Sequence, residues 1–182
     1  MSDNDVSEQT TKNETLRALE FVGEGSAAVQ RIFAMIGHSR FFTDFTPGDI
    51  DLLARHMRVY RAQAGQTIIR EGDIDDYMLL IIEGQVEILK HQSAAQGGPQ
   101  AMTVVGPGAT LGEMSMIDGE PRFATCVAQE PTTFASLSRD DMVKIILEEP
   151  SLGAKILIKL VTLLSARLRQ TSQDLLQHLA KP

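Results

Sequence analysis

Two opposite charges stand nine residues apart in an otherwise mostly apolar stretch, LGEMSMIDGEPRFATC at residues 111–126. Glu113 follows a glycine, and Arg122 follows a proline, with the turn sequence DGEP between them. A buried charge is costly unless it is paired or bound to something, so a purely structural segment would avoid both. A guanidinium can hold a phosphate with two N–H donors, and the free N–H groups at a helix start bind anions. The pattern therefore predicts a bound anion.

The surroundings of this pair suggest what each neighbour does. Gly112 lets the backbone come close to a ligand, and Glu113, Met114 and Ser115 read as the first turn of a short helix. Glu113 cannot face the same anion favourably, so it needs a donor, for which a sugar hydroxyl is the natural candidate. The alternative is a structural salt bridge between Glu113 and Arg122 with no ligand at all. Met114 and Met116 are expected in the core, and Cys126 in a buried strand.

Composition argues against several other classes of protein. The single cysteine excludes an internal disulfide and a cysteine-based metal cluster, and the four histidines form no ligand-spaced pair. No nucleophile, metal set or second carboxylate accompanies Glu113, so we expect no catalytic residue, no metal, no cofactor and no enzyme. Asp75-Asp76 and Glu148-Glu149 read as solvated caps. The net charge of −7 argues against a protein built to hold nucleic acid.

The N-terminal sequence, MSDNDVSEQTTKNET, is polar and acidic and does not resemble a signal peptide. No window is long and apolar enough for a membrane span, which favours a cytoplasmic location without membrane contact. Residues 1–24 offer little apolar content to bury, so they are predicted to form a flexible or disordered arm.

Within residues 25–150 the sequence pattern changes twice, from helical to strand-like and back to helical. Two helical patterns, SAAVQRIFAMIG and TPGDIDLLARHM, flank the aromatic FFTDF, and Thr46 and Pro47 are predicted to begin the second helix. From Val59 to Leu137 the runs QTIIR, YMLLIIEG, QVEILK, MTVVG, ATCVA and TTFASL alternate with glycine turns, and QGGP is a predicted hairpin loop. Short strands without helix-length patterns between them indicate an antiparallel β-roll, jelly-roll-like, in an α+β fold. Ser138, with Asp141 three residues on, is predicted to cap the next helix.

Residues 151–182 are predicted to form a long C-terminal helix. One side carries a narrow seam with the alternating spacing of a coiled coil, composed of Leu157, Val161, Leu164, Leu168, Thr171, Leu175 and His178. A helix of this length extends about 40 Å, too far for one roll to cover. We therefore expect a homodimer through this helix; packing of its first half on its own roll is the alternative. The lysines and arginines outside the seam are expected to be solvated.

The same residues carry a family resemblance. The motif G-E-M-S-M-I-x-x-x-P-R-x-A-T resembles the phosphate-binding cassette of cyclic nucleotide-binding domains, the family of the catabolite activator protein and of the regulatory subunits of cyclic AMP-dependent kinase. The entry helices, the glycine-punctuated strands and the last helix are similar over residues 30–179, in the family's order. The resemblance implies a sensor that binds a cyclic nucleotide, most of all cyclic AMP, and acts on an unidentified effector protein.

Individual positions can then be matched to the family's motif. The resemblance implies that Gly112, Met114 and Ser115 offer backbone groups to the cyclic phosphate, that Arg122 pairs with its oxygens, and that Glu113 accepts from the ribose 2′-hydroxyl. Phe123 and Ala124 complete the cassette. Further on, SARLRQTSQDL is similar to the dimer helix of the bacterial activators, in which a Thr-Ser pair, here Thr171 and Ser172, reaches the purine from the partner chain.

Two departures from the family shape these expectations. Phe123 stands where a serine, threonine or alanine is usual, so the ring stacks on a purine, fills the pocket without ligand, or points outward. Moreover, no helix-turn-helix follows the long helix, so direct DNA binding is not expected. Two other functions stay open: a ligand-free dimerisation or scaffold module of the same fold, and a receptor for cyclic di-GMP.

Overall fold

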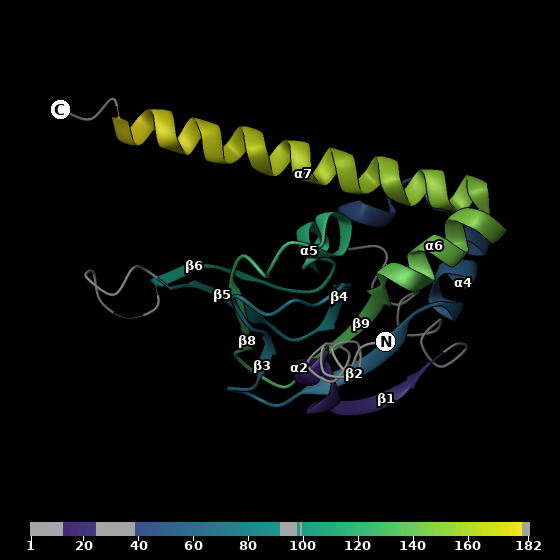
Figure 1. The fold of residues 1–182 in the computed structure, drawn as a ribbon, viewed down its shortest axis with the longest axis horizontal. Coiled ribbons are helices and arrows are strands. Elements are labelled where there is room, and N and C mark those ends of the chain that lie inside the picture. Colours follow the sequence, from purple (N-terminus) through teal and green to yellow (C-terminus); the bar gives the residue numbers. More distant parts are fainter. Residues whose placement is uncertain (1–12, 25–38, 92–97, 99, 180–182) are drawn as a thin grey trace, which may run out of the picture.

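The computed structural model describes residues 13–24, 39–91, 98 and 100–179, which form two antiparallel sheets and a layer of helices (Figure 1). One sheet has the order β1-β2-β9-β4-β7 and the other β3-β8-β5-β6. The strands are β1 (Glu20–Glu24), β2 (Arg58–Ala62), β3 (Thr67–Ile69), β4 (Tyr77–Glu83), β5 (Val86–Lys90), β6 (Gln100–Val105), β7 (Thr110–Leu111), β8 (Thr125–Ala128) and β9 (Thr132–Ser138). The helical elements are α2 (Glu14–Arg17), η2 (Arg40–Phe42), α4 (Pro47–Arg55), α5 (Glu113–Asp118), α6 (Arg139–Glu148) and α7 (Pro150–Leu179).

Strand β4 shows how the sequence separates the two halves of the core. Its side chains alternate between the faces of the sheet, as the two-residue period of a strand requires. Tyr77, Leu79 and Ile81 point into the cluster shared with the smaller sheet. Met78, Leu80 and Ile82 point into the cluster shared with α4, α6 and α7. Strand β4 is therefore buried on both faces, which is why YMLLIIE is an almost unbroken apolar run.

The strands predicted from sequence between residues 66 and 137 are confirmed in position and in antiparallel pairing. So are the helix starts. Thr46 accepts a hydrogen bond from the Asp49 N–H and closes a capping box, with Pro47 in the first turn. Ser138 accepts from the Asp141 N–H. The predicted helix SAAVQRIFAMIG and most of the QGGP loop lie outside the described residues.

The prediction of a flexible arm was wrong for residues 13–24. This segment forms α2 and then β1, which pairs antiparallel with β2 at the edge of the larger sheet. Leu16 and Leu19 are buried in the core cluster that also contains Tyr77. The prediction relied on the polar composition of the segment. It did not take into account that two leucines can pack in the core and that an edge strand can pair through backbone hydrogen bonds. Residues 1–12 lie outside the described residues.

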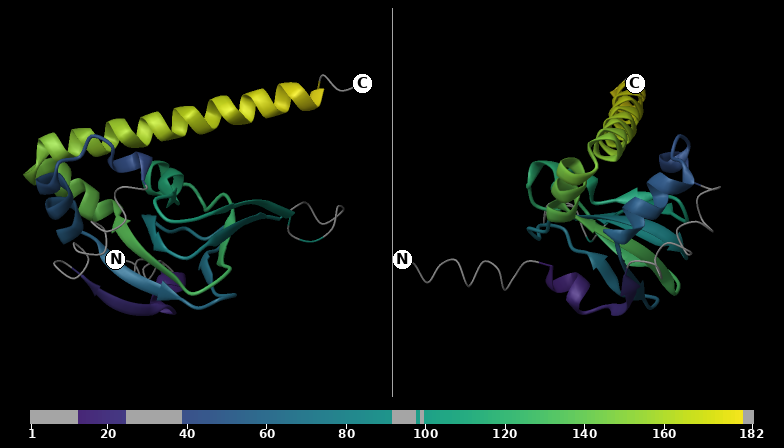
Figure 2. Two further views of the ribbon diagram at one scale, coloured as in Figure 1. Left: turned by 180° about the vertical axis from the view of Figure 1, so that it is seen from behind. Right: turned by 90° about the vertical axis from the view of Figure 1, so that its right-hand side faces the viewer.

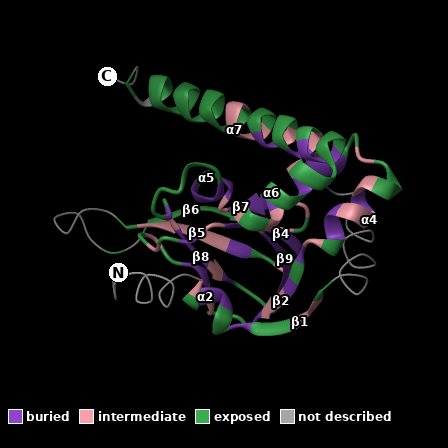
Figure 3. Cartoon of the chain, turned by 45° about the vertical axis from the view of Figure 1, so that its right-hand side comes forward, coloured by how far each residue is buried: buried purple, intermediate pink, exposed green. Residues whose placement is uncertain are grey.

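The long helix α7 is confirmed, and its two halves differ in environment. Leu152, Ile156 and Leu160 bury one side of the first half against the roll. The second half runs on past α5 (Figures 1 and 2), and residues 166–177 are exposed (Figure 3). Leu164 is half-buried, and the other apolar seam residues, Leu157, Val161, Leu168 and Leu175, are exposed. No helix in the described residues is both long and apolar enough to cross a membrane.

Three basic residues of α7 are not the solvated side chains that we expected. Lys155 forms an ion pair with Asp49 at 2.5 Å, and Lys159 forms one with Asp44. Arg167 forms an ion pair with Glu113, the first residue of α5. The prediction was wrong because these cations lie on or beside the helix face that docks on the roll, where acidic side chains from distant parts of the sequence meet them.

Candidate anion-binding site

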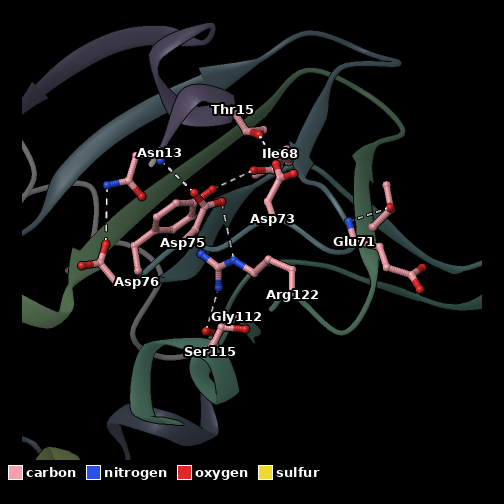
Figure 4. Close-up of polar contacts among 12 residues, drawn as sticks. Asn13, Thr15, Ile68, Glu71, Asp73, Asp75, Asp76, Gly112, Ser115 and Arg122 are labelled. Atoms are coloured by element: carbon pink, nitrogen blue, oxygen red, sulfur yellow. Dashed lines mark hydrogen bonds and ion pairs between the residues drawn. The ribbon is translucent and has the colours of Figure 1, made fainter. Parts of the chain in front are cut away.

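Gly112 and Arg122 pack directly against each other at the start of α5 (Figure 4). Gly112 has a φ of 77°, a backbone conformation that glycine adopts without strain. A Cβ atom at this position would lie 2.4 Å from Arg122 Nη1. Arg122 Nη1 donates to the Gly112 carbonyl oxygen at 2.9 Å. The predicted need for a glycine here is therefore explained by the arginine itself, which occupies the space of a side chain.

The guanidinium of Arg122 is buried and only partly bonded. The residue is 2% exposed, yet Nε and Nη2 have no hydrogen-bond partner among the described residues. The group lies over the Tyr77 ring, with Cζ 4.2 Å from the ring centroid, a cation–π contact. Burial raises the pKa of the Tyr77 hydroxyl, so Tyr77 stays neutral and donates to the Ile68 carbonyl oxygen. Buried donors without an acceptor are costly, so Nε and Nη2 could each donate to an acceptor such as an anion.

Asp75 is the carboxylate nearest to Arg122, which corrects two expectations. Its Oδ2 lies 3.7 Å from Arg122 Nε, and both side chains are almost fully buried. The prediction that Asp75 is a solvated cap was wrong, and the alternative of a Glu113–Arg122 salt bridge is not what the structure contains. The backbone explains the approach: Arg122 N–H donates to the Asp73 carbonyl oxygen, and Gly72 N–H donates to the Arg122 carbonyl oxygen. These bonds hold the DIDD turn against the arginine.

Glu113 is buried but bonded to other residues. Its Oε1 accepts from the Thr110 hydroxyl at 2.8 Å and lies 2.9 Å from Arg167 Nη1. Arg167 Nη2 also donates to the Thr110 carbonyl oxygen at 2.9 Å. The carboxylate expected to accept from a ligand hydroxyl therefore joins the cassette to α7 in this structure. Sequence reasoning missed Arg167 because it stands outside the heptad seam and 54 residues from its partner.

The rest of α5 is held by a residue that the sequence analysis did not single out. Arg139, at the start of α6, donates from Nε to the Met116 carbonyl oxygen and from Nη2 to the Ser115 carbonyl oxygen. These bonds satisfy carbonyl groups at the end of a short helix. Ser115 is buried, and Met116 is in the core as predicted, whereas Met114 is half-exposed, contrary to the prediction.

Phe123 points outward, which was one of the three arrangements open from sequence. The residue is 54% exposed, so its ring does not fill the site. The Lys90 ammonium lies 4.2 Å from the ring centroid and donates to the Phe123 carbonyl oxygen. Lys90 also forms an ion pair with Glu71, whose pKa falls to about 2 because it accepts from the His91 N–H and from Lys90. Ala124 is half-buried next to it.

Thr171 and Ser172 are not brought to the cassette within one chain. Both are exposed on α7, and the Ser172 hydroxyl donates to the Leu168 carbonyl oxygen of its own helix. In the described residues, Arg167 is the α7 side chain that hydrogen-bonds to the cassette. Cys126 is buried in β8, as predicted, and burial raises its pKa to about 12.

Several known proteins resemble this chain in sequence and in fold. The family described as cyclic nucleotide-binding domain matches residues 59–149. A crystal structure of a cyclic nucleotide-binding domain from Methylobacillus flagellatus KT is 39% identical, with a TM-score of 0.77, over 88% of this chain and 89% of that one. Its likeness confirms the predicted architecture of an antiparallel roll, short helices and a long final helix.

Two curated relatives match over a smaller share of their own length. The cyclic AMP receptor protein of Thermus thermophilus is 28% identical over 75% of this chain and 61% of the relative. The acetyltransferase Pat of Mycolicibacterium smegmatis is 36% identical over 50% of this chain and 26% of the relative. The chain thus spans less than two thirds of either protein.

Proposed function

The chain belongs to the cyclic nucleotide-binding domain family, and from that premise we propose that it is a non-catalytic sensor of a cyclic nucleotide. Cyclic AMP is the first candidate, since the Thermus thermophilus relative is named as its receptor. The single observation that supports binding most directly is Arg122, a buried guanidinium with two nitrogen atoms that lack acceptors. A cyclic phosphate carries one negative charge and two free oxygens that could fill these places.

The proposed signal passes from the cassette to α7. A ribose 2′-hydroxyl that donates to Glu113 would compete with Arg167 for the same carboxylate. Arg167 connects Glu113 to a helix whose second half is exposed, so a change at Glu113 alters how α7 lies over the roll. Its exposed seam, Leu157, Val161, Leu168 and Leu175, would pair two chains, and Thr171 and Ser172 of the partner copy would complete the purine site. An effector protein would then read the position of the helix.

One observation favours the second candidate, a ligand-free module of the same fold. Asp75 already compensates part of the charge on Arg122, and Glu113 already has a cation and a hydroxyl as partners. A protein in which Arg122 and Glu113 are both paired with its own side chains could serve as a dimerisation or scaffold unit without a nucleotide.

Calorimetry on the purified protein separates the two candidates. Cyclic AMP, cyclic GMP and cyclic di-GMP are titrated into the wild type, Arg122→Lys and Arg55→Ala. Lysine keeps the positive charge but lacks the planar fork that holds two phosphate oxygens, so we expect binding of a mononucleotide to weaken roughly tenfold or more in Arg122→Lys. Arg55, an exposed arginine on α4, is the control and should leave the affinity unchanged. Circular dichroism verifies that each variant is folded.

The outcomes are distinct. No heat signal with any of the three ligands would favour the scaffold module. A signal with cyclic di-GMP alone would move the proposal to the cyclic dinucleotide. Equal affinities in the wild type and Arg122→Lys would remove Arg122 from the binding site.

A further inference from the structure

The N-terminal segment Asn13–Glu24 lies against the turn that carries the counter-ion of Arg122 (Figure 4). The Asn13 backbone N–H donates to Asp75 Oδ1 at 2.8 Å, and the Thr15 hydroxyl donates to Asp73 Oδ2 at 3.3 Å. Leu16 and Leu19 anchor the segment in the core cluster beside Tyr77. The Asn13 side-chain amide also donates to Asp76 Oδ1 at 3.5 Å, so three polar contacts and two buried leucines connect the chain's first described residues to the turn behind the anion-binding site.

The two oxygens of Asp75 face different parts of the protein. Oδ1 is bonded to Asn13, whereas Oδ2 faces Arg122 and has no hydrogen-bond partner among the described residues. The Asn13 N–H therefore fixes the carboxylate in the orientation that aims Oδ2 at Arg122 Nε. In a buried site, where screening by water is weak, a second anion at Arg122 would be repelled by this carboxylate.

From this arrangement we infer that the segment Asn13–Glu24 is an autoinhibitory latch on the anion-binding site. While attached, it holds Asp75 beside Arg122 and opposes a phosphate group. A bound phosphate in turn weakens the attachment of the segment, because a coupling between two equilibria acts equally in both directions. Ligand would thereby loosen α2 and β1 as an output separate from the movement of α7. The inference rests on the proposed function, since it assumes that a cyclic nucleotide is the anion.

A matched pair of substitutions at Asn13 tests the latch. Asn13 has a φ of 64°, which glycine adopts freely while keeping the backbone N–H. Proline lacks the N–H and fixes φ near −65°, so Asn13→Pro removes the bond to Asp75, whereas Asn13→Gly retains it. Calorimetry with cyclic AMP on the full chain should give about fivefold tighter binding, or more, in Asn13→Pro than in Asn13→Gly. Hydrogen exchange in the wild type should show faster exchange of the amides of residues 14–24 when cyclic AMP saturates the site.

Equal or weaker binding by Asn13→Pro, in a protein whose wild type binds cyclic AMP, would overturn the latch and leave the sensor standing. If no variant binds any cyclic nucleotide, the proposed sensor function is rejected. The contact between Asn13, Asp75 and Arg122 is then tested in the unliganded protein. A double-mutant cycle then measures unfolding free energies of Asn13→Pro, Arg122→Lys and the combination. Coupling through Asp75 requires non-additive effects, and simple additivity would overturn the latch independently of any ligand.

Discussion

At the scale of single residues, the cassette depends on a glycine and an arginine that share one small volume. Gly112 has no side chain, so the Arg122 guanidinium can lie on its backbone and donate to its carbonyl oxygen. The same contact turns Nη2 and Nε away from Gly112, so that these donors remain for an acceptor. The pair therefore serves both the fold and the proposed binding of an anion.

Substitution of Gly112 by alanine should cost more stability than the same change at Gly65. Both glycines have positive φ, but nothing lies within 4 Å of a Cβ at Gly65. Gly65→Ala thus measures the backbone strain alone, roughly 1 to 2 kcal/mol. Gly112→Ala must also displace Arg122 and break its charged hydrogen bond, which adds roughly 1 to 3 kcal/mol. Urea unfolding measures both variants, and equal losses would show that the Arg122 contact contributes nothing to stability.

At the scale of elements, α7 is attached to the roll by two different kinds of contact. Its first half has an apolar face, formed by Leu152, Ile156 and Leu160, with two ion pairs beside it. Its middle is held by Arg167, which bonds to Glu113 and Thr110. Only the second contact touches a predicted ligand-binding residue. The first half therefore anchors the helix, and the Arg167 contact is where the cassette and the helix meet.

Replacing Arg167 by methionine should loosen the middle of α7 without unfolding the roll. Glu113 would lose its cation, but the Arg167 side chain is 47% exposed and partly screened, so we expect a stability loss of only roughly 1 kcal/mol. Hydrogen exchange should quicken in α7 amides near residue 167, and Arg169→Met, at an exposed neighbour, is the control. The stability loss caused by Arg167→Met should be smaller when Glu113 is also replaced by glutamine. Equal exchange in both methionine variants would contradict the role of this contact.

At the scale of the whole molecule, the second half of α7 runs past the roll and is coloured as exposed over most of its length (Figure 3). The exposed residues Val161, Leu168 and Leu175 recur at the spacing of a coiled coil. A second copy of the same helix would bury this seam on both chains at once. The proposed homodimer would therefore cover the apolar side chains that are exposed on the single chain.

A charge in the middle of the seam should separate the proposed dimer into monomers. Leu168 is 69% exposed in the single chain, so Leu168→Glu should change the stability of the protomer by less than about 0.5 kcal/mol. Leu147→Glu, at a residue on α6 that is 74% exposed, introduces the same charge outside the seam as a control. Sedimentation should give half the wild-type mass for Leu168→Glu alone. A wild type that sediments as a monomer would refute the dimer directly.

The local pattern of the sequence was enough to predict the strands, the helix caps and the residues of the cassette. The apolar run YMLLIIE between turn signals, the Thr46 and Ser138 caps, and the glycine before Glu113 are each recognised from neighbours a few positions away. Such features are fixed by backbone geometry, whose periods are the same in every fold. The roll could therefore be predicted, whereas the binding of an anion at Arg122 stays a prediction.

Only the tertiary structure decided which charges face each other. Asn13 and Asp75 are 62 positions apart, and neither the burial of Asp75 nor the attachment of residues 13–24 has a local signal. The same holds for Arg167, whose position outside the heptad seam predicted a solvated side chain and which the fold brings to Glu113. The energy of a charge depends on how much water and which partners surround it, and both are set by chain segments that meet only on folding.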